Sequence, residues 1–258
     1  MMYRAVFLDF YGTLVHEDDD IIPLICERIR ESASIECTNQ EIGRYWWSEF
    51  SRIFRSSHGE GFKLQRTIGL ESLAETIRHF GSGARAEEII GLQFEHWTRP
   101  RLYPDTKPFL DSLRRTGTPV YILSNIDRSD IEYAVSYHGI HAQGILTSED
   151  VRAYNPRPEL FRKALMQYRL KADEVIHIGD SLTSDVQGAQ SLGIAAMWLN
   201  RLANRRRKGS SPITSAPPWM RLSRCCKAVI RRRQGREATR IPYIDSVRRI
   251  LLLLNLKA

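Results

Sequence analysis

The chain has 258 residues, of which 42% are hydrophobic, and a formal net charge of +8 at pH 7. This length accommodates one large domain or a core with a smaller second domain. No apolar run approaches the roughly 20 residues of a membrane span, and the apolar run 5–8 ends at Asp9 without a signal-peptide pattern. None of the four Cys has the C-x-x-C spacing of a zinc or redox site. We therefore expect a soluble, cytoplasmic protein with reduced thiols and no membrane span.

The first hundred residues predict one strand followed by helices. Residues 4–8 (R-A-V-F-L) form a short apolar run, typical of a buried strand that delivers Asp9 to its carboxyl end. Between about residues 18 and 99 the apolar side chains recur at helix spacing. The predicted helices are 21–29, a helix capped by Asn39, 64–79 and 86–97, with Gly-rich breaks at 59–61 and 81–83. Four such helices form a bundle large enough to act as a lid.

Strand and helix patterns alternate from residue 106 onward. The predicted helices are 106–115, 127–137, 158–168 and 184–192, and the predicted strands are 119–123, 144–147, 174–178 and 195–199. Alternation at this spacing indicates a parallel sheet with helices on both faces. Ligands bind outside the carboxyl ends of the strands in such sheets, so polar residues at strand ends are the candidates for a site.

Three predicted strand ends carry polar residues that suit catalysis. Asp9 lies in D-F-Y-G-T-L, Ser124 in L-S-N-I-D, and Asp180 and Asp185 in G-D-S-L-T-S-D. A carboxylate at the open end of a buried strand is partly desolvated, which favours nucleophilic attack. Three carboxylates near a phosphate repel one another, and a hard divalent cation with oxygen ligands, usually Mg²⁺, cancels this repulsion.

The turn after the first strand suits anion binding. Gly12 permits a tight turn that brings Thr13 and backbone N–H groups near one anion. Ser124 and Asn125 lie at the end of the second core strand, where ligands of such sheets bind. These four residues are the candidate substrate-binding residues.

Taken together, the motifs resemble those of the haloacid dehalogenase superfamily. D-F-Y-G-T-L is similar to its first motif, L-S-N to its second, Y-N-P-R-P-E-L-F to its third and G-D-S-L-T-S-D to its fourth, and P-Y-I-D-S-V-R-R-I-L-L resembles the final strand and helix. The resemblance implies a Rossmann-like α/β core with a helical-bundle cap inserted after the first strand. The implied domains are a core over 1–17, 100–201 and 240–258, a cap over 18–99 and a basic insertion over 202–239.

The same resemblance implies residue roles. Asp9 would attack the substrate and form an aspartyl-phosphate. The residues that would hold Mg²⁺ are Asp9, Tyr11 through its backbone carbonyl, Asp180 and, in support, Asp185, and those that would bind the transferred phosphoryl group are Thr13 and Ser124. The implied substrate is a small phosphorylated metabolite.

Tyr11 is a departure from the family's phosphatases, which carry a second Asp two residues after the nucleophile to protonate the leaving group. Tyr at this position is similar to the superfamily's dehalogenases, and a general acid typically contributes about 10²–10⁴-fold. A haloacid needs no metal, however, and the pair Asp180 and Asp185 is typical of a metal site. We therefore favour a phosphatase and keep a 2-haloacid dehalogenase as the alternative.

Asn155 is a second departure, because the family's third motif has a Lys there. Asn cannot replace a cation electrostatically, although Arg152 or Arg157 could. Loss of a preorganised cation commonly costs a few kcal/mol of transition-state stabilisation. A further alternative is therefore a weakened catalyst that binds polyanions.

The segment 18–99 is expected to select the substrate. His58, Lys63 and Arg44 are its candidate contacts. The adjacent rings at 45–47 are expected in the core of this segment, with at least one exposed.

The basic charge is concentrated in one segment. Residues 201–240 hold 13 Lys and Arg and one acidic residue, a net charge of +12, whereas the rest of the chain carries 25 basic and 29 acidic residues, a net charge of −4. Within 202–239, a Ser/Pro-rich linker precedes apolar residues near helical spacing from Trp219 to Ile230 with Arg and Lys between them. Such a basic amphipathic helix suits nucleic acid or another polyanion, and the alternative is a flexible insertion without a partner.

Overall fold

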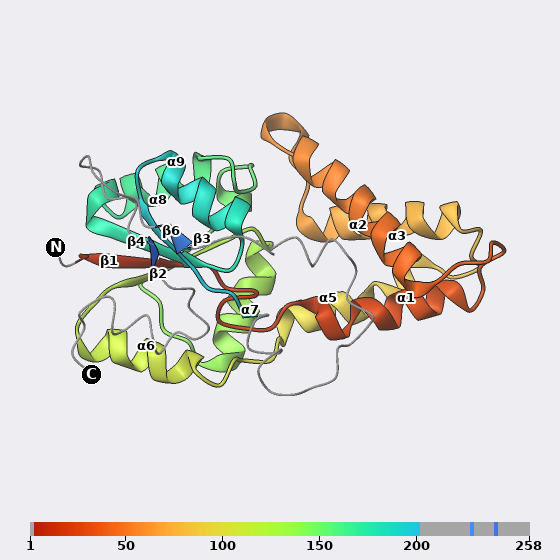
Figure 1. Cartoon of the computed structure of the whole chain (residues 1–258), viewed down its shortest axis with the longest axis horizontal. Coiled ribbons are helices and arrows are strands. Elements are labelled where there is room, and N and C mark those ends of the chain that lie inside the picture. Colours follow the sequence, from red (N-terminus) through yellow and green to blue (C-terminus); the bar gives the residue numbers. More distant parts are fainter. Residues whose placement is uncertain (1–2, 202–227, 230–239, 242–258) are drawn as a thin grey trace.

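A five-stranded parallel sheet forms the centre of the molecule in the computed structural model, which describes residues 3–201, 228–229 and 240–241 (Figure 1). The strand order is β3-β2-β1-β4-β5. The strands are β1 (Ala5–Leu8), β2 (Val120–Ser124), β3 (Gly144–Thr147), β4 (Val175–Gly179) and β5 (Ala195–Trp198). The predicted parallel α/β fold is confirmed, and β1, which leads to Asp9, is its central strand.

Helices cover both faces of the sheet, as alternation of side chains along β1 requires. Val6 and Leu8 pack in one apolar cluster with α6 (Thr106–Arg115) and α7 (Arg128–His138). Ala5 and Phe7 pack in a second cluster with α8 (Glu159–Gln167) and α9 (Gly188–Ser191). Both faces of β1 are thus buried, so its residues form a continuous apolar run.

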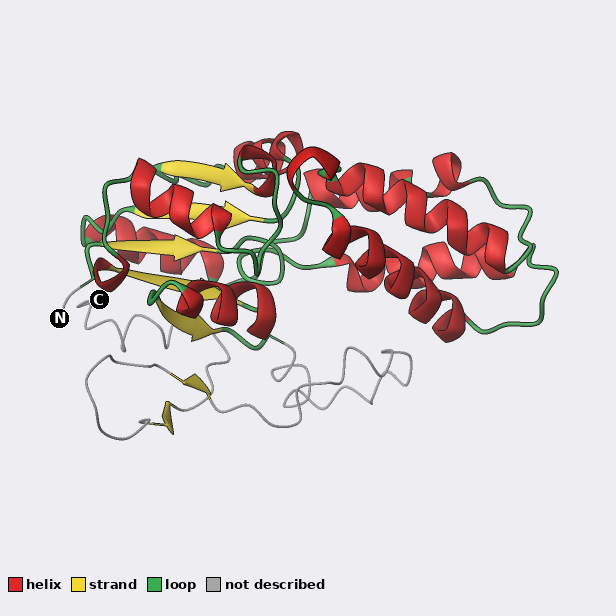
Figure 2. Ribbon diagram, turned by 90° about the horizontal axis from the view of Figure 1, so that it is seen from above, coloured by secondary structure: helices red, strands yellow, loops and turns green. Residues whose placement is uncertain are grey.

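A second group of helices lies beyond the carboxyl ends of the strands (Figure 2). This group, which we call the helical lobe, consists of α1 (Ile22–Arg30), α2 (Asn39–Ser56), α3 (Gln65–His79), α4 (Ala86–Ile89) and α5 (Gly91–Thr98). It has its own apolar core, which includes Ile25, Ile42 and Leu73. Trp46 is buried in this core whereas Trp47 is 47% exposed, as their adjacency predicts. Among the described residues, no helix combines the length and apolar character that crossing a membrane requires.

Short helices complete the described part of the chain. They are η1 (Asp18–Asp20), η2 (Gly59–Gly61), η3 (Ser148–Asp150), η4 (Ala172–Glu174) and the π-helix η5 (Leu182–Gln187). Two predicted helices are therefore divided: 86–97 forms α4 and α5, and the helix predicted over 184–192 is η5 followed by α9.

The predicted cap of α2 is wrong by one residue. Thr38, not Asn39, is the N-cap: its hydroxyl accepts from the Glu41 N–H at 3.2 Å, and the Glu41 carboxylate accepts from the Thr38 N–H at 2.9 Å. This reciprocal pair satisfies two of the free N–H groups at the helix start. Asn39 lies inside the helix, and its amide donates to Glu27 at 2.7 Å.

Most of the predicted basic insertion 202–239 lies outside the described residues. Its described part, β6 (Ala228–Val229), pairs antiparallel with β7 (Arg240–Ile241). The predicted amphipathic helix is therefore wrong at Val229, and β7 joins β6 instead of the five-stranded sheet. Residues 242–258, predicted to hold the last strand and helix of the core, are also outside the described residues. The division into core, cap and insertion stays a prediction.

Candidate active site

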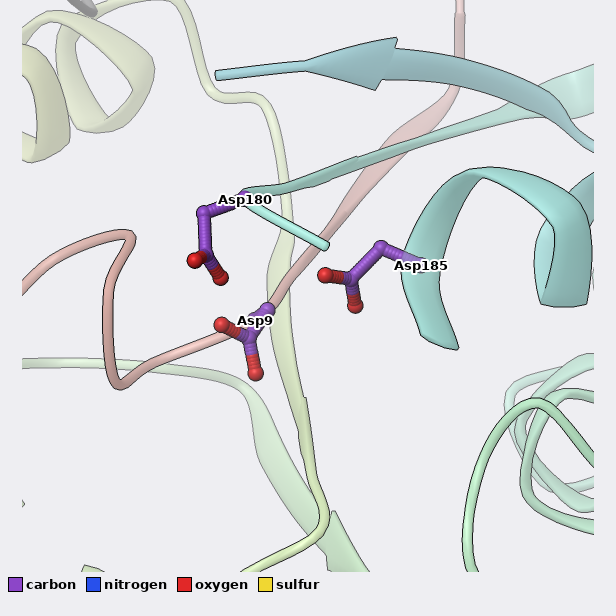
Figure 3. A group of neighbouring side chains, drawn as sticks. All are labelled: Asp9, Asp180 and Asp185. Carbon is purple, nitrogen blue, oxygen red and sulfur yellow. The ribbon is translucent and has the colours of Figure 1, made fainter. Parts of the chain in front are cut away.

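Three aspartates converge at the carboxyl edge of the sheet. Asp9 follows β1, Asp180 follows β4, and Asp185 lies in η5. Because β1 and β4 are parallel neighbours, with Leu8 opposite Ile178, their ends meet at one place. One carboxylate oxygen from each aspartate lies within 4.8 Å of those of the other two, and the three side chains point toward one another (Figure 3).

Two glycines make this approach possible. Gly12 has φ +79°, and a Cβ there would lie 2.5 Å from Oδ2 of Asp180. A Cβ on Gly179 would lie 2.2 Å from Cγ of Asp185. Any side chain at either position would push a carboxylate away, so the glycines are part of the geometry of the acidic cluster.

The electrostatics of the cluster suit a cation. Burial raises the pKa of Asp9 well above its usual value, and the nearby Asp185 raises it further. Burial, then Glu17, then Asp9 raise the pKa of Asp180 in the same way. Partly buried carboxylates that destabilise one another in this way are oxygen ligands of the kind that Mg²⁺ prefers, so the donor set fits a hard divalent cation.

The loop after Asp9 is held by hydrogen bonds to the side chain and to the backbone of Thr13. The Thr13 hydroxyl donates to Oδ2 of Asp9 at 3.1 Å. The Arg201 guanidinium donates to the Thr13 carbonyl at 2.6 Å and to both carboxylate oxygens of Asp105 at 2.8 Å. Arg201 also lies over the Tyr103 ring at 4.0 Å from its centroid. The nucleophile candidate is therefore held on a loop that is tied to the start of α6.

Tyr11 directs its side chain toward the helical lobe. Its hydroxyl donates to the Trp97 carbonyl in α5. Burial, followed by the carboxylates of Asp130 and Asp18, raises the pKa of the Tyr11 hydroxyl well above its usual value. At neutral pH this phenol is a weak acid whose proton already serves a structural hydrogen bond.

The candidates at the end of β2 differ in burial, since Ser124 is buried and Asn125 is half-buried. The Ser124 hydroxyl accepts from the Ile126 N–H at 3.4 Å. Asn125 uses Oδ1 to accept from the Ser148 hydroxyl at 2.7 Å and from the Asn155 N–H at 2.8 Å. The Asn125 side chain thus ties three loops at this edge of the sheet together.

Asn155 brings no charge to this edge. It is 2% exposed, and its Oδ1 has no hydrogen-bond partner among the described residues. The two arginines near it are engaged elsewhere. Arg152 donates to the carbonyls of Gly59 at 2.8 Å and Glu60 at 3.2 Å, and Arg157 pairs with Glu159 at 2.8 Å.

The lobe candidates make contacts of their own. The Lys63 ammonium pairs with Glu71 at 2.6 Å. His58 forms an isolated antiparallel bridge with Ala153 of the core. Arg44 lines a hollow of about 450 Å³ formed by lobe residues alone.

Several residues that follow the core strands were not predicted from the sequence as part of the site. The Asp127 carboxylate accepts from the N–H groups of Gln65 at 2.7 Å and Arg66 at 2.9 Å, at the start of α3. Asp130, one turn later, accepts from the Arg66 side chain. Asp127 follows L-S-N-I directly and Asp130 comes three residues later, but no local pattern indicates that their partners lie some sixty residues away. Glu17 was likewise overlooked, because a single exposed acidic residue in a loop has no distinctive pattern.

The fold combines a parallel α/β sheet, a carboxylate cluster at the carboxyl edge of the sheet and a helical lobe above that edge. This combination is typical of α/β enzymes that bind a metal ion at the ends of their strands. The family model of haloacid dehalogenase-like hydrolases matches residues 3–193. The chain therefore belongs to the haloacid dehalogenase-like hydrolase family.

Its relatives include enzymes of two kinds. A phosphoserine phosphatase of Thermus thermophilus is 30% identical over 189 residues, which cover 67% of this chain and 74% of that protein. The (S)-2-haloacid dehalogenase H-109 of Pseudomonas putida is 24% identical over 206 residues, which cover 77% of this chain and 86% of that protein. The structure of an L-2-haloacid dehalogenase from Xanthobacter autotrophicus aligns with a TM-score of 0.69 at 18% identity, with 100% of both chains covered. These comparisons support a hydrolase and leave the choice between the two reactions to other evidence.

Proposed function

We propose that this protein is a Mg²⁺-dependent phosphatase that hydrolyses a small phosphorylated metabolite through an aspartyl-phosphate on Asp9. The observation that carries the proposal is the cluster of Asp9, Asp180 and Asp185, whose carboxylate oxygens lie within 4.8 Å of one another. A 2-haloacid brings a single negative charge and needs no cation, whereas a phosphate monoester brings two. The acidic cluster therefore favours the substrate that is bound together with a metal.

The chain's own residues perform the two displacement steps. Thr13 holds Oδ2 of Asp9 by a hydrogen bond of 3.1 Å, which leaves Oδ1 to attack phosphorus as the P–O bond to the leaving group breaks. Water then attacks phosphorus, the Asp9–phosphoryl bond breaks, and inorganic phosphate leaves. Mg²⁺, held by the three carboxylates and the Tyr11 carbonyl, would neutralise the charge on the phosphoryl oxygens. The Ser124 hydroxyl would donate to those oxygens, and the Thr13 hydroxyl, whose one proton is used in the bond to Asp9, would do so only after it turns away from Oδ2.

Leaving-group protonation is the weak step of this site. The Tyr11 hydroxyl donates to the Trp97 carbonyl, and its raised pKa makes it a poor proton donor. We expect aryl and acyl phosphates, whose leaving groups need no proton, to react at least 100-fold faster than alkyl phosphates. Equal rates for both classes would show that another residue supplies the proton.

Aryl phosphate hydrolysis and halide release from a 2-haloacid, assayed side by side, separate the two reactions. The proposal predicts phosphate release that requires Mg²⁺, stops with EDTA and is lost in Asp9→Asn. Asp111→Asn is the matched control, because Asp111 is an exposed residue that pairs with Arg114 on α6. Metal-independent halide release without phosphatase activity would identify a dehalogenase, and full activity of Asp9→Asn would refute the nucleophile.

A further inference from the structure

A buried histidine contacts the acidic cluster from within the sheet. His177 lies in the middle of β4 with 0% of its surface exposed. Its Nε2 lies 2.9 Å from Oδ1 of Asp185, while the edge of its ring faces Phe161 with the ring centroids 4.9 Å apart. The other residues of the strand are apolar or Gly (V-I-H-I-G), so this imidazole is the polar exception in a strand that is otherwise fully apolar.

The hydrogen-bond pattern identifies the form of the imidazole. A carboxylate only accepts, so Nε2 carries the proton in the contact with Asp185. Nδ1 is buried and has no partner among the described residues. Nε2 is therefore the ring nitrogen that donates, and this N–H orients the Asp185 carboxylate.

Asp185 is held at both of its oxygens. Oδ1 accepts from His177, and Oδ2 accepts from the Ser181 N–H at 2.8 Å. Gly179 leaves the space that the Asp185 carboxylate occupies. The two donors come from β4 and from the start of η5, so they fix both the position and the rotation of the carboxylate before any ligand arrives.

We infer that His177 is a positioning residue for the cation site of this protein, acting through Asp185; this inference rests on the proposed Mg²⁺-dependent function. Outer-shell donors that orient metal ligands typically change metal affinity by about 10- to 100-fold when they are removed. The affinity of the full-length protein for Mg²⁺ should therefore depend on a donor at the place of Nε2, and not merely on a side chain that fills the space.

Three substitutions separate positioning from packing, with Mg²⁺ alone as the probe in isothermal titration calorimetry of the full-length protein. His177→Gln can place its amide N–H where Nε2 lies and should bind Mg²⁺ within about threefold of the unchanged protein. His177→Leu fills a similar volume without a donor, and His177→Asn carries a donor too short to reach Asp185, so both should bind about 10- to 100-fold more weakly. The thermal midpoint of each variant in EDTA establishes that the folded protein is being titrated.

Each outcome bears on the inference. Weak binding by Asn beside near-normal binding by Gln supports positioning, even if His177→Leu fails to fold. Equal Mg²⁺ affinity for the folded Asn, Gln and unchanged proteins would overturn the role of His177 while the proposed function stands. An unchanged protein that binds no Mg²⁺ would overturn the proposed function, and this inference with it.

Discussion

The ion pair between Arg66 and Asp130 offers a sharp test of how the helical lobe is fixed to the core. Arg66 lies in the first turn of α3, and Asp130 lies in the first turn of α7. The guanidinium contacts both carboxylate oxygens, with Nε 2.8 Å from Oδ2 and a terminal nitrogen 2.5 Å from Oδ1. It also lies over the Phe94 ring at 4.4 Å from the centroid. We expect removal of the two partners to have unequal effects on stability.

The inequality follows from burial. The Asp130 side chain is 1% exposed, whereas that of Arg66 is 37% exposed. Arg66→Met leaves a buried carboxylate without its cation and should lower the free energy of unfolding by about 2–3 kcal/mol, below the range for fully buried pairs because water reaches this one. Asp130→Asn leaves an arginine that water can solvate and an amide that still accepts a hydrogen bond, and should cost about 1 kcal/mol.

Urea unfolding of the two variants measures the difference. Arg78→Met is the matched control, since Arg78 pairs with Glu75 on the exposed face of the same helix with 76% of its side chain exposed, and it should leave the free energy of unfolding nearly unchanged. If the free energy of unfolding fell equally in Arg66→Met and Asp130→Asn, or fell more in Asp130→Asn, the unpaired buried carboxylate would not be the main source of destabilisation.

Three further predictions concern the acidic edge. Because burial and Glu17 raise the folded-state pKa of Asp180 above its unfolded value, the metal-free protein should lose stability as the pH rises through that raised pKa. Asp180→Asn should remove this loss and raise the thermal midpoint in EDTA at pH 7.5 by about 3 °C per kcal/mol recovered. A lower midpoint for Asp180→Asn would show that the ionised carboxylate stabilises the metal-free protein. Gly12→Ala, whose Cβ would lie 2.5 Å from Oδ2 of Asp180, should reduce kcat/KM at least 100-fold, while Gly117→Ala, with φ +68° and nothing within 4 Å, should lower stability and leave activity intact. Asn155→Lys should raise kcat about tenfold in a phosphatase assay, equivalent to about 1.4 kcal/mol of barrier, and an unchanged kcat would show that another residue supplies the charge.

Much of the fold could be predicted because its signals are local. The predicted 106–115 helix and 144–147 strand match α6 and β3 at both ends. Asp9 and Asp180 could be placed together because parallel strands end at one edge of the sheet. The cap of α2 was misplaced because Thr38 and Asn39 are both good capping residues, and the choice depends on the reciprocal bond with Glu41 three residues after Thr38.

The unpredicted parts of the site depend on contacts between distant segments. Asp127 accepts from the backbone at the start of α3, and neither segment has a sequence pattern that indicates contact with the other. The sequence around His177 is apolar and therefore predicts only a buried strand. The hydrogen bond from His177 to Asp185 depends on the packing of η5 against β4, which the strand pattern does not indicate. Such pairs are set by tertiary packing, which hydrophobic periodicity does not encode.

The loop that carries Asn155 is shared between the core and the lobe, and this has a consequence for catalysis. Arg152 bonds to the carbonyls of Gly59 and Glu60, and the Tyr154 hydroxyl donates to the Lys63 carbonyl at 2.7 Å. The Tyr154 ring stacks on Phe54 of α2 with a centroid distance of 4.1 Å. All three residues before Asn155 thus contact the lobe, since Ala153 forms the bridge with His58, while Asn155 itself is anchored to Asn125 of the core. A displacement of the lobe must therefore strain or move this loop, so the part of the protein proposed to select the substrate also sets the position of the residue that replaces the family's lysine.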